Sequence, residues 1–311
     1  MTHPHAHEHS HHDHAPQDFQ RAFAIGIVLN AAFVAIEAGY GWHINSLALL
    51  ADAAHNLSDV AGLALAWMAA VAGRLRPDAR HTYGWRRASI LAAFANAVLL
   101  LLAMGSLAWE ALGRLSTPQA TQGWTIIAVA AVGIVVNTGT ALLFLRGRAH
   151  DMNVRGAFLH MAADALVSLG VVIGGALYLW HGWAWLDPVM SLLIAAIIVA
   201  GTWGLLRQSL HLLFDGVPEG IDLPVVQDWL AKRPGVAGVD DLHVWAMSTT
   251  QVALTAHLRM PRGHPGDAFL RETSAGLQQH FGIGHVTLQT VTGAALLSCH
   301  DPQPPSPTQH G

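Results

Sequence analysis

Charged side chains are scarce in this chain. Asp, Glu, Lys and Arg make up 12% of its 311 residues, whereas a soluble globular domain has roughly 25%. Hydrophobic residues reach 52%, and the mean hydropathy is +0.38. The net charge of −4 gives no sign of the basic character that is typical of nucleic-acid-binding domains. This composition indicates a membrane protein that binds no nucleic acid.

Cysteine is almost absent, and two functional motifs are missing. Cys299 is the only cysteine, so the chain forms no intrachain disulfide. The sequence has no Gly-rich Walker loop for nucleotide phosphates and no His-Glu-x-x-His motif of a zinc hydrolase. These absences argue against an ATP-driven pump and against a metalloprotease-type enzyme.

Histidine, by contrast, is abundant. The chain has 21 histidines against 16 Lys and Arg residues, and seven of the histidines lie in the first 14 residues. That segment lacks the basic and apolar regions of a secretory signal peptide, and its composition favours disorder. We expect residues 1–18 to form a His-rich disordered cytoplasmic tail, which either concentrates metal weakly near a transport pathway or has no role.

Six apolar stretches follow, each long enough for one helix to cross a bilayer, which takes about 20 residues. We predict six spans, at residues 23–41, 46–72, 89–112, 124–145, 156–180 and 185–206. One side of these spans carries a single arginine, Arg114, and the other carries Arg21, Arg74, Arg76, Arg80, Arg86, Arg87, Arg146, Arg148, Arg155 and Arg207. The Arg-rich side is expected to be cytoplasmic, so both termini are predicted to be cytoplasmic and the transmembrane domain to cover residues 19–214.

The pattern changes after residue 214. Residues 222–233 and 265–281 predict helices, while residues 236–247, 251–260 and 285–291 alternate between apolar and polar side chains as strands do. This αββαβ order predicts a small α+β domain over residues 215–298, with an antiparallel sheet and both helices on one face. Residues 299–311 are rich in proline, and we expect them to be disordered.

Ionisable residues inside the apolar spans carry the chemistry. Asp52, His55 and Asp59 are spaced to share one face of the second span, and His160 and Asp164 repeat the spacing of four in the fifth span. An ionised carboxylate at the centre of a bilayer costs about 2.5–3.5 kcal/mol, so such groups face a partner, a cavity or an ion. If the two helices face each other, two imidazoles and two carboxylates converge.

Two His and two Asp ligands suit a tetrahedral Zn²⁺ ion, with Cd²⁺ and Co²⁺ as competitors, because oxygen-only sites are those that Mg²⁺, Ca²⁺ and Mn²⁺ prefer. The alternative is that the two His-x-x-x-Asp pairs form hydrogen bonds between helices. Asp52 either supports the ligands or is a structural polar residue. Asp187, which is followed by proline, is predicted to cap the sixth span.

Several motifs resemble the cation diffusion facilitator (CDF) family. Residues 46–59, SLALLADAAHNLSD, resemble its second-helix signature, and residues 153–164, NVRGAFLHMAAD, its fifth helix. Residues 81–88, HTYGWRRA, resemble its first cytoplasmic loop, and residues 241–245, DLHVW, together with residues 285–289, HVTLQ, its cytoplasmic domain.

The resemblance implies a polytopic α-helical membrane protein with six transmembrane helices and a C-terminal ferredoxin-like cytoplasmic domain. It also implies a homodimeric metal/proton antiporter in which His55, Asp59, His160 and Asp164 bind the transported ion. Zn²⁺ is then the transported substrate and, at a second site, a candidate structural or regulatory ion.

The resemblance places that second site in the cytoplasmic domain at His257 and His285. Asp240 stands where relatives often have histidine, and Cys299 with His300 could add ligands; the alternative is that the two histidines are ordinary strand residues. The resemblance also points to a loop site at Asp78 and His81. Trp85 stands where those relatives have a further histidine, so only two ligands remain. The alternative is that Asp78 and His81 are solvated loop residues without a metal.

From these observations we expect an integral protein of a bacterial cytoplasmic (inner) membrane, a secondary transporter whose partners are divalent metal ions, protons, membrane lipid and a second copy of itself. It would export the metal by alternating access, as cytoplasmic loading releases protons from the ligands and external protons later displace the metal. The competing interpretations are a membrane-bound metal sensor that transports nothing and an intramembrane metallohydrolase.

Overall fold

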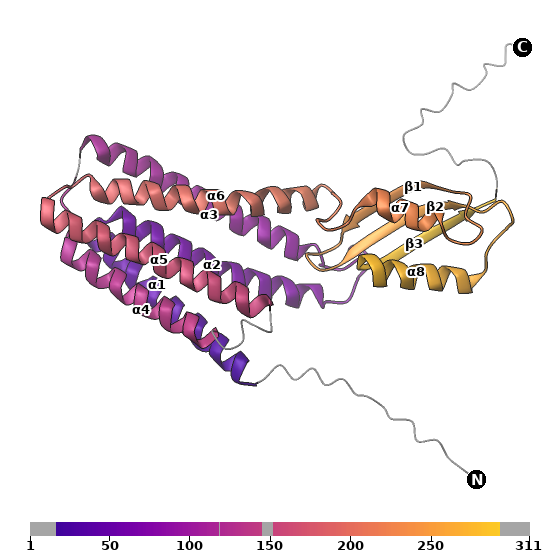
Figure 1. Ribbon diagram of the computed structural model, residues 1–311, viewed down its shortest axis with the longest axis horizontal. Coiled ribbons are helices and arrows are strands. Elements are labelled where there is room, and N and C mark those ends of the chain that lie inside the picture. The colour runs from indigo at the N-terminus through magenta and orange to yellow at the C-terminus, as the bar shows by residue number, and fades with distance from the viewer. Residues whose placement is uncertain (1–16, 118, 145–151, 293–311) are drawn as a thin grey trace, which may run out of the picture. The chain divides into compact units, whose positions relative to one another are not determined.

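The computed structural model describes residues 17–117, 119–144 and 152–292, without the side chains of residues 17–27, 63, 66, 70, 143–144, 152–157 and 160. Six long helices come first and a small α+β domain follows, in the predicted order (Figure 1). The helices are α1 Gln17–His43, α2 Leu47–Gly73, α3 Ala88–Ser116, α4 Gly123–Phe144, α5 Met152–His181 and α6 Leu186–Leu213.

Helices α2 to α6 are, within the described residues, long and apolar enough to cross a bilayer. Helix α1 is also 27 residues long, although part of it lies among the residues without described side chains. The described chain forms two compact units. One contains the residues up to Ala61 together with Leu99–Thr202, and the other contains Gly62–Val98 and the chain from Trp203 onward.

In the first unit, α4 packs along α5 and also contacts α1 (Figure 1). A close approach between these helices depends on Gly133 of α4. A Cβ atom added there would lie 2.7 Å from the ring of Phe33 on α1 and 3.0 Å from Oγ of Ser168 on α5. The buried core of this unit includes Phe33, Leu49, Ala51, Leu100, Met104, Ala130, Val171 and Ile194.

The start of α2 is held by a residue of α6. Asp187 accepts hydrogen bonds from Oγ of Ser46 at 2.5 Å and from the backbone N–H groups of Leu47 at 2.8 Å and Ala48 at 3.4 Å. Helix α6 begins close to the predicted place. The carboxylate of Asp187, however, accepts hydrogen bonds from the free N–H groups of α2 rather than those of α6, so one helix supplies the N-terminal cap of another. The side-chain cap predicted for α6 is thus a cap for α2.

The single arginine on the other side of the spans has a structural role. Arg114 donates a hydrogen bond to the backbone carbonyl of Asn45 at 2.6 Å and lies 3.0 Å from Glu110. Asn45 has a left-handed backbone conformation, with φ 56°, in the short connection between α1 and α2. Arg114 therefore stabilises that tight turn.

The second unit includes the α+β domain, formed by α7 Leu223–Ala231, β1 Gly238–Ala246, β2 Val252–Arg259, α8 Asp267–Phe281 and β3 Ile283–Val291. Both helices share one core with the sheet, and its buried members include Val226, Leu230, Leu254, Leu258, Leu277 and Ile283. Strands β1 and β2 are antiparallel, whereas β2 and β3 are parallel. The predicted antiparallel sheet was wrong for β3, because a strand that follows a crossover helix pairs in parallel.

Candidate metal centre

Helix α2 brings its three ionisable residues onto one face, because residues three, four and seven positions apart on a helix are neighbours. Nε2 of His55 lies 3.7 Å from Oδ2 of Asp59, one turn further along. The side chains of His55 and Asp59 are 19% and 32% exposed, so this end of the site is accessible to an ion.

Helix α5 supplies the second part of the site. Oδ1 of Asp164 lies 3.4 Å from Nε2 of His55, and the Asp164 side chain is only 2% exposed. Two donors bound to one tetrahedral Zn²⁺ ion at 2.0–2.1 Å lie about 3.3–3.4 Å apart. The distance between His55 and Asp164 therefore matches one edge of a zinc coordination tetrahedron.

The remaining predicted ligand is His160, one turn before Asp164 on α5; its side chain lies outside the described residues. In the part of the chain that the structure describes, no three His, Cys, Asp or Glu side chains form a complete group that could hold a metal ion. The carboxylates of Asp59 and Asp164 both lie within 4 Å of Nε2 of His55. A complete coordination shell needs a further ligand or a small movement of these side chains.

Polar residues behind the ligands connect the helices. Asp52 accepts a hydrogen bond from Oγ of Ser168 at 3.2 Å, and both side chains are fully buried. Glu37 of α1, also fully buried, accepts a hydrogen bond from the side-chain amide of Asn56 at 3.5 Å. This network ties α1 and α5 to the ligand-bearing part of α2.

Ser168 and Asn56 are supporting residues that were not predicted from the sequence. A signal was present for both: Ser168 lies four residues after Asp164, and Asn56 follows His55 directly. Serine and asparagine are common enough in membrane helices as hydrogen-bonding residues that spacing alone did not single them out.

The candidate metal site of the cytoplasmic domain, predicted at Asp240, His257 and His285, has a different arrangement in the structure. Asp240 lies 3.0 Å from Nε of Arg259. Its neighbour Asp241 instead lies 3.0 Å from Nε2 of His243 and 3.8 Å from Nδ1 of His257. The register of β1 shifts between Asp240 and His243, and Asp241 has a positive φ of 49°. Asp240 is the residue paired with His257 in the register of β1 and β2, and the bulge brings the carboxylate of Asp241 close to His257 as well.

His285 lies away from His257 within one chain. His285 pairs with Ala253 in the register of β2 and β3, whereas His257 pairs with Gln289. Four residues along a strand correspond to about 13 Å. The ring of His285 instead packs edge-on against Tyr83, with 5.4 Å between the ring centres. A shared ion at both histidines would therefore need ligands from a second copy of the chain.

The loop candidates contact each other. Asp78 accepts hydrogen bonds from the backbone N–H groups of His81 at 2.6 Å and Arg80 at 2.7 Å, and its carboxylate lies 3.3 Å from Nδ1 of His81. The N–H groups of His81 and then Arg80 hold the pKa of Asp78 below its usual value. His81 also stacks on Trp85, with 4.4 Å between the ring centres. These contacts are those of a folded turn. The carboxylate oxygens of Asp78 that a metal would need already accept hydrogen bonds within that turn.

Comparison with known proteins covers both parts of the chain. Residues 23–214 match the cation efflux transmembrane domain, and residues 218–290 match the cytoplasmic domain of cation efflux proteins. The chain is 35% identical to the zinc transporter ZitB of Escherichia coli over 96% of its own length and 95% of that relative. It is 37% identical to the metal cation efflux system protein CzcD of Cupriavidus metallidurans, over 89% and 88% of the two chains.

A third relative is the cadmium, cobalt and zinc/H⁺-K⁺ antiporter of Bacillus subtilis, which is 31% identical over 91% of this chain and 92% of that protein. By their names these relatives are transporters and efflux proteins, and each is covered over most of its length. The chain therefore belongs to the cation diffusion facilitator family of cation efflux transporters.

Proposed function

We propose that this protein exports Zn²⁺ from the cytoplasm in exchange for protons, with His55, Asp59, His160 and Asp164 as the ligands of the transported ion. Cd²⁺ and Co²⁺ are the expected competitors. The observation that carries the proposal is the 3.4 Å distance between His55 on α2 and Asp164 on α5. Residues far apart in the sequence thus place a nitrogen and an oxygen ligand at one point among membrane-spanning helices.

Proton exchange follows from the chemistry of these ligands. Imidazole binds metal only when it is neutral, and carboxylates only when they are ionised, so metal binding and protonation compete for the same atoms. Histidine changes its charge near neutral pH, which suits exchange between two compartments of slightly different pH. Alternating access of one site then couples the two ions without a nucleotide.

The proposed topology has residues 19–214 in the bacterial inner membrane, residues 215–298 in the cytoplasm, and both termini on the cytoplasmic side. A homodimer formed through residues 215–298 is part of the same proposal. A second copy could supply the ligands that His257 and His285 lack within one chain. The tails at residues 1–18 and 299–311, including Cys299 and His300, lie outside the described residues.

Transport into proteoliposomes tests the proposal. Purified protein is reconstituted, a pH gradient is imposed, and uptake of Zn²⁺, Cd²⁺, Co²⁺ and Mn²⁺ is followed with an internal metal-sensitive dye. We expect Zn²⁺ uptake that collapses when the gradient is dissipated and that is lost in His55→Ala. The control is His43→Ala, an exposed histidine of α1 away from the site. Full zinc uptake by His55→Ala would refute the ligand assignment.

The same experiment separates the rival functions. A metal sensor would bind Zn²⁺ without any uptake, and uptake would then be absent in the unmodified protein as well. A metallohydrolase needs an open coordination position with a bound water and a general base. The proposed set of four protein ligands leaves no open position on the metal for that water.

A further inference from the structure

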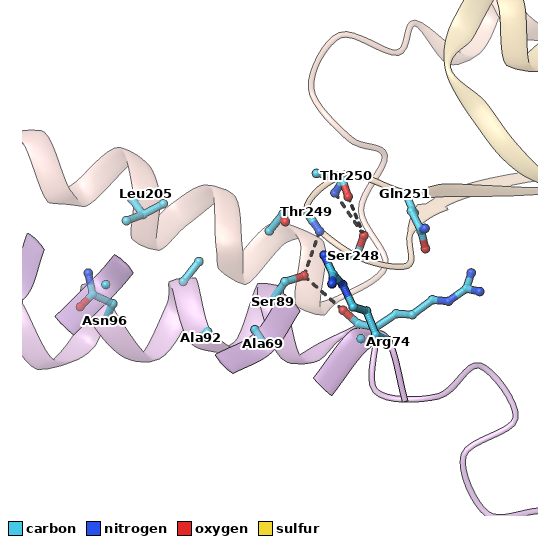
Figure 2. A pocket seen from close by; sticks show the side chains of 14 residues that line it. Ala69, Arg74, Ser89, Ala92, Asn96, Leu205, Ser248, Thr249, Thr250 and Gln251 are labelled. Carbon is cyan, nitrogen blue, oxygen red and sulfur yellow. Dashed lines mark hydrogen bonds between the residues drawn. The ribbon is translucent and has the colours of Figure 1, made fainter. Parts of the chain in front are cut away.

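The second unit contains a pocket of about 500 Å³ that none of the proposed metal ligands lines. Its walls come from the end of α2, the start of α3, Leu205 on α6, and the turn between β1 and β2. Figure 2 shows Ala92 and Leu205 toward one end and Arg74, Ser89 and the β1–β2 turn toward the other. The pocket is therefore polar at one end and mostly apolar at the other.

Two arginines make the charge at the polar end positive. Arg74 and Arg86 line the pocket, and no acidic side chain does. Among the described residues neither guanidinium has an ion-pair partner, whereas Arg87, in the same loop, binds Asp215. A metal cation would be repelled here. This end of the pocket favours an anion that can bind two guanidinium groups. Phosphate is such an anion, because arginine binds it with two parallel hydrogen bonds.

The polar end is also fixed in place. The backbone N–H of Thr249 donates to Oγ of Ser89 at 3.1 Å, and Ser89 in turn donates to the backbone carbonyl of Arg86 at 3.1 Å (Figure 2). The N–H of Thr250 is bonded to Oγ of Ser248 at 3.1 Å. These bonds connect the β1–β2 turn to the start of α3, so the residues around the two arginines are held without a ligand.

The apolar end belongs to membrane-spanning helices and is lined by small side chains. Gly62, Ala69, Gly73, Ala92 and Ala93 leave the space open, with Leu205 as the one large apolar residue and Asn96 as the one polar residue there. A free phosphate ion would fill only the arginine end. A molecule with a phosphate at one end and hydrocarbon at the other matches both ends.

We propose that this pocket binds an anionic phospholipid, with the headgroup phosphate between Arg74 and Arg86 and the first part of the acyl chains over the glycines and alanines of α2 and α3. Basic pockets between membrane helices on the cytoplasmic side are suited to such headgroups. The α+β domain belongs to the cytoplasmic-domain family, and its β1–β2 turn forms part of the wall, so the lipid would come from the cytoplasmic leaflet. This proposal does not depend on the metal ligands.

Lipid retention by the full-length protein tests the idea. Detergent-purified protein is incubated with phosphatidylglycerol or phosphatidylcholine, and bound lipid is counted by native mass spectrometry. Removing two arginine charges with Arg74→Gln/Arg86→Gln should weaken phosphatidylglycerol binding about thirtyfold. The matched control is Arg76→Gln/Arg80→Gln, which removes the same charge from exposed residues of the same loop that do not line the pocket, and it should bind as the unmodified protein does.

A second variant covers the case in which the double substitution does not fold, and it distinguishes lipid from free anion. Ala92→Leu keeps both arginines and fills the apolar end, so it should lower phosphatidylglycerol binding while leaving the thermal shift caused by inorganic phosphate unchanged. Equal losses in the two arginine pairs would overturn the proposal, because binding would then follow general surface charge. Full binding by Ala92→Leu, with displacement of the lipid by inorganic phosphate, would overturn it in favour of a free-anion site.

Discussion

Nε2 of His55 lies 3.4 Å from Oδ1 of Asp164, so one atom of α2 and one atom of α5 can share an ion. We expect Asp164→Asn to keep the shape of the buried side chain but remove a negative charge from the ligand set. Zinc affinity, measured by calorimetry on the detergent-solubilised protein, should fall at least about tenfold, since even residues behind a metal ligand contribute that much. Asp228→Asn, an exposed carboxylate on α7, is the control. Unchanged affinity in Asp164→Asn would exclude it as a ligand.

Ser168 should matter through Asp52. In Ser168→Ala the fully buried Asp52 loses its hydrogen-bond donor, which should lower the free energy of unfolding by about 1–3 kcal/mol. If the two residues act together, the double variant Asp52→Ala/Ser168→Ala should be less destabilised than the sum of the single variants. Strict additivity in denaturation experiments in mixed micelles would show that the 3.2 Å contact contributes nothing.

Asp187 should stabilise the start of α2. Removing its three hydrogen bonds in Asp187→Ala should destabilise the protein by about 1–2 kcal/mol, as the loss of a good helix cap does. Asp222→Ala is the matched control, because Asp222 precedes α7 but forms no side-chain cap bond, so its effect should stay within about 0.5 kcal/mol. Thermal unfolding in detergent compares the two, and similar shifts for both would contradict the capping role.

Metal bound by the cytoplasmic domain should depend on Asp241 more than on Asp240. Asp241 contacts both His243 and His257, whereas Asp240 lies against Arg259. In a background that carries His55→Ala and Asp164→Ala, remaining zinc is counted by equilibrium dialysis of the full-length protein. Asp241→Asn should lower this number and Asp240→Asn should not. The reverse result would restore the assignment made from the sequence.

The turn at Asp78 should resist acid. Its pKa is lowered by the backbone N–H groups of His81 and Arg80. The turn is therefore fully stabilised by this carboxylate above the ordinary Asp pKa of about 3.9, and it loses that stabilisation only as the pH falls through the lower, folded value. The carboxyl carbon of Asp78, followed by NMR, should titrate below the carboxylates of unstructured peptides. A titration at the ordinary value would contradict the observed hydrogen bonds.

Much of this architecture follows from local patterns. The length of each apolar stretch predicts a spanning helix, and the helical period places Asp52, His55 and Asp59 on one face without any knowledge of neighbouring helices. The αββαβ order follows in the same way from alternation and periodicity. These features depend on residues close together in the chain, which is why the sequence alone determined them.

Contacts between distant segments were decided by the tertiary structure. Only the side-chain contacts between α2 and α5 show that Ser168 supports Asp52, and only the approach of α6 shows that Asp187 caps α2. A single bulge in β1 decides that the carboxylate of Asp241 comes within 4 Å of His257 while that of Asp240 lies against Arg259, and the crossover through α8 decides that β3 is parallel. Each depends on where a second element lies in space, and a local pattern in the chain has no information about that position.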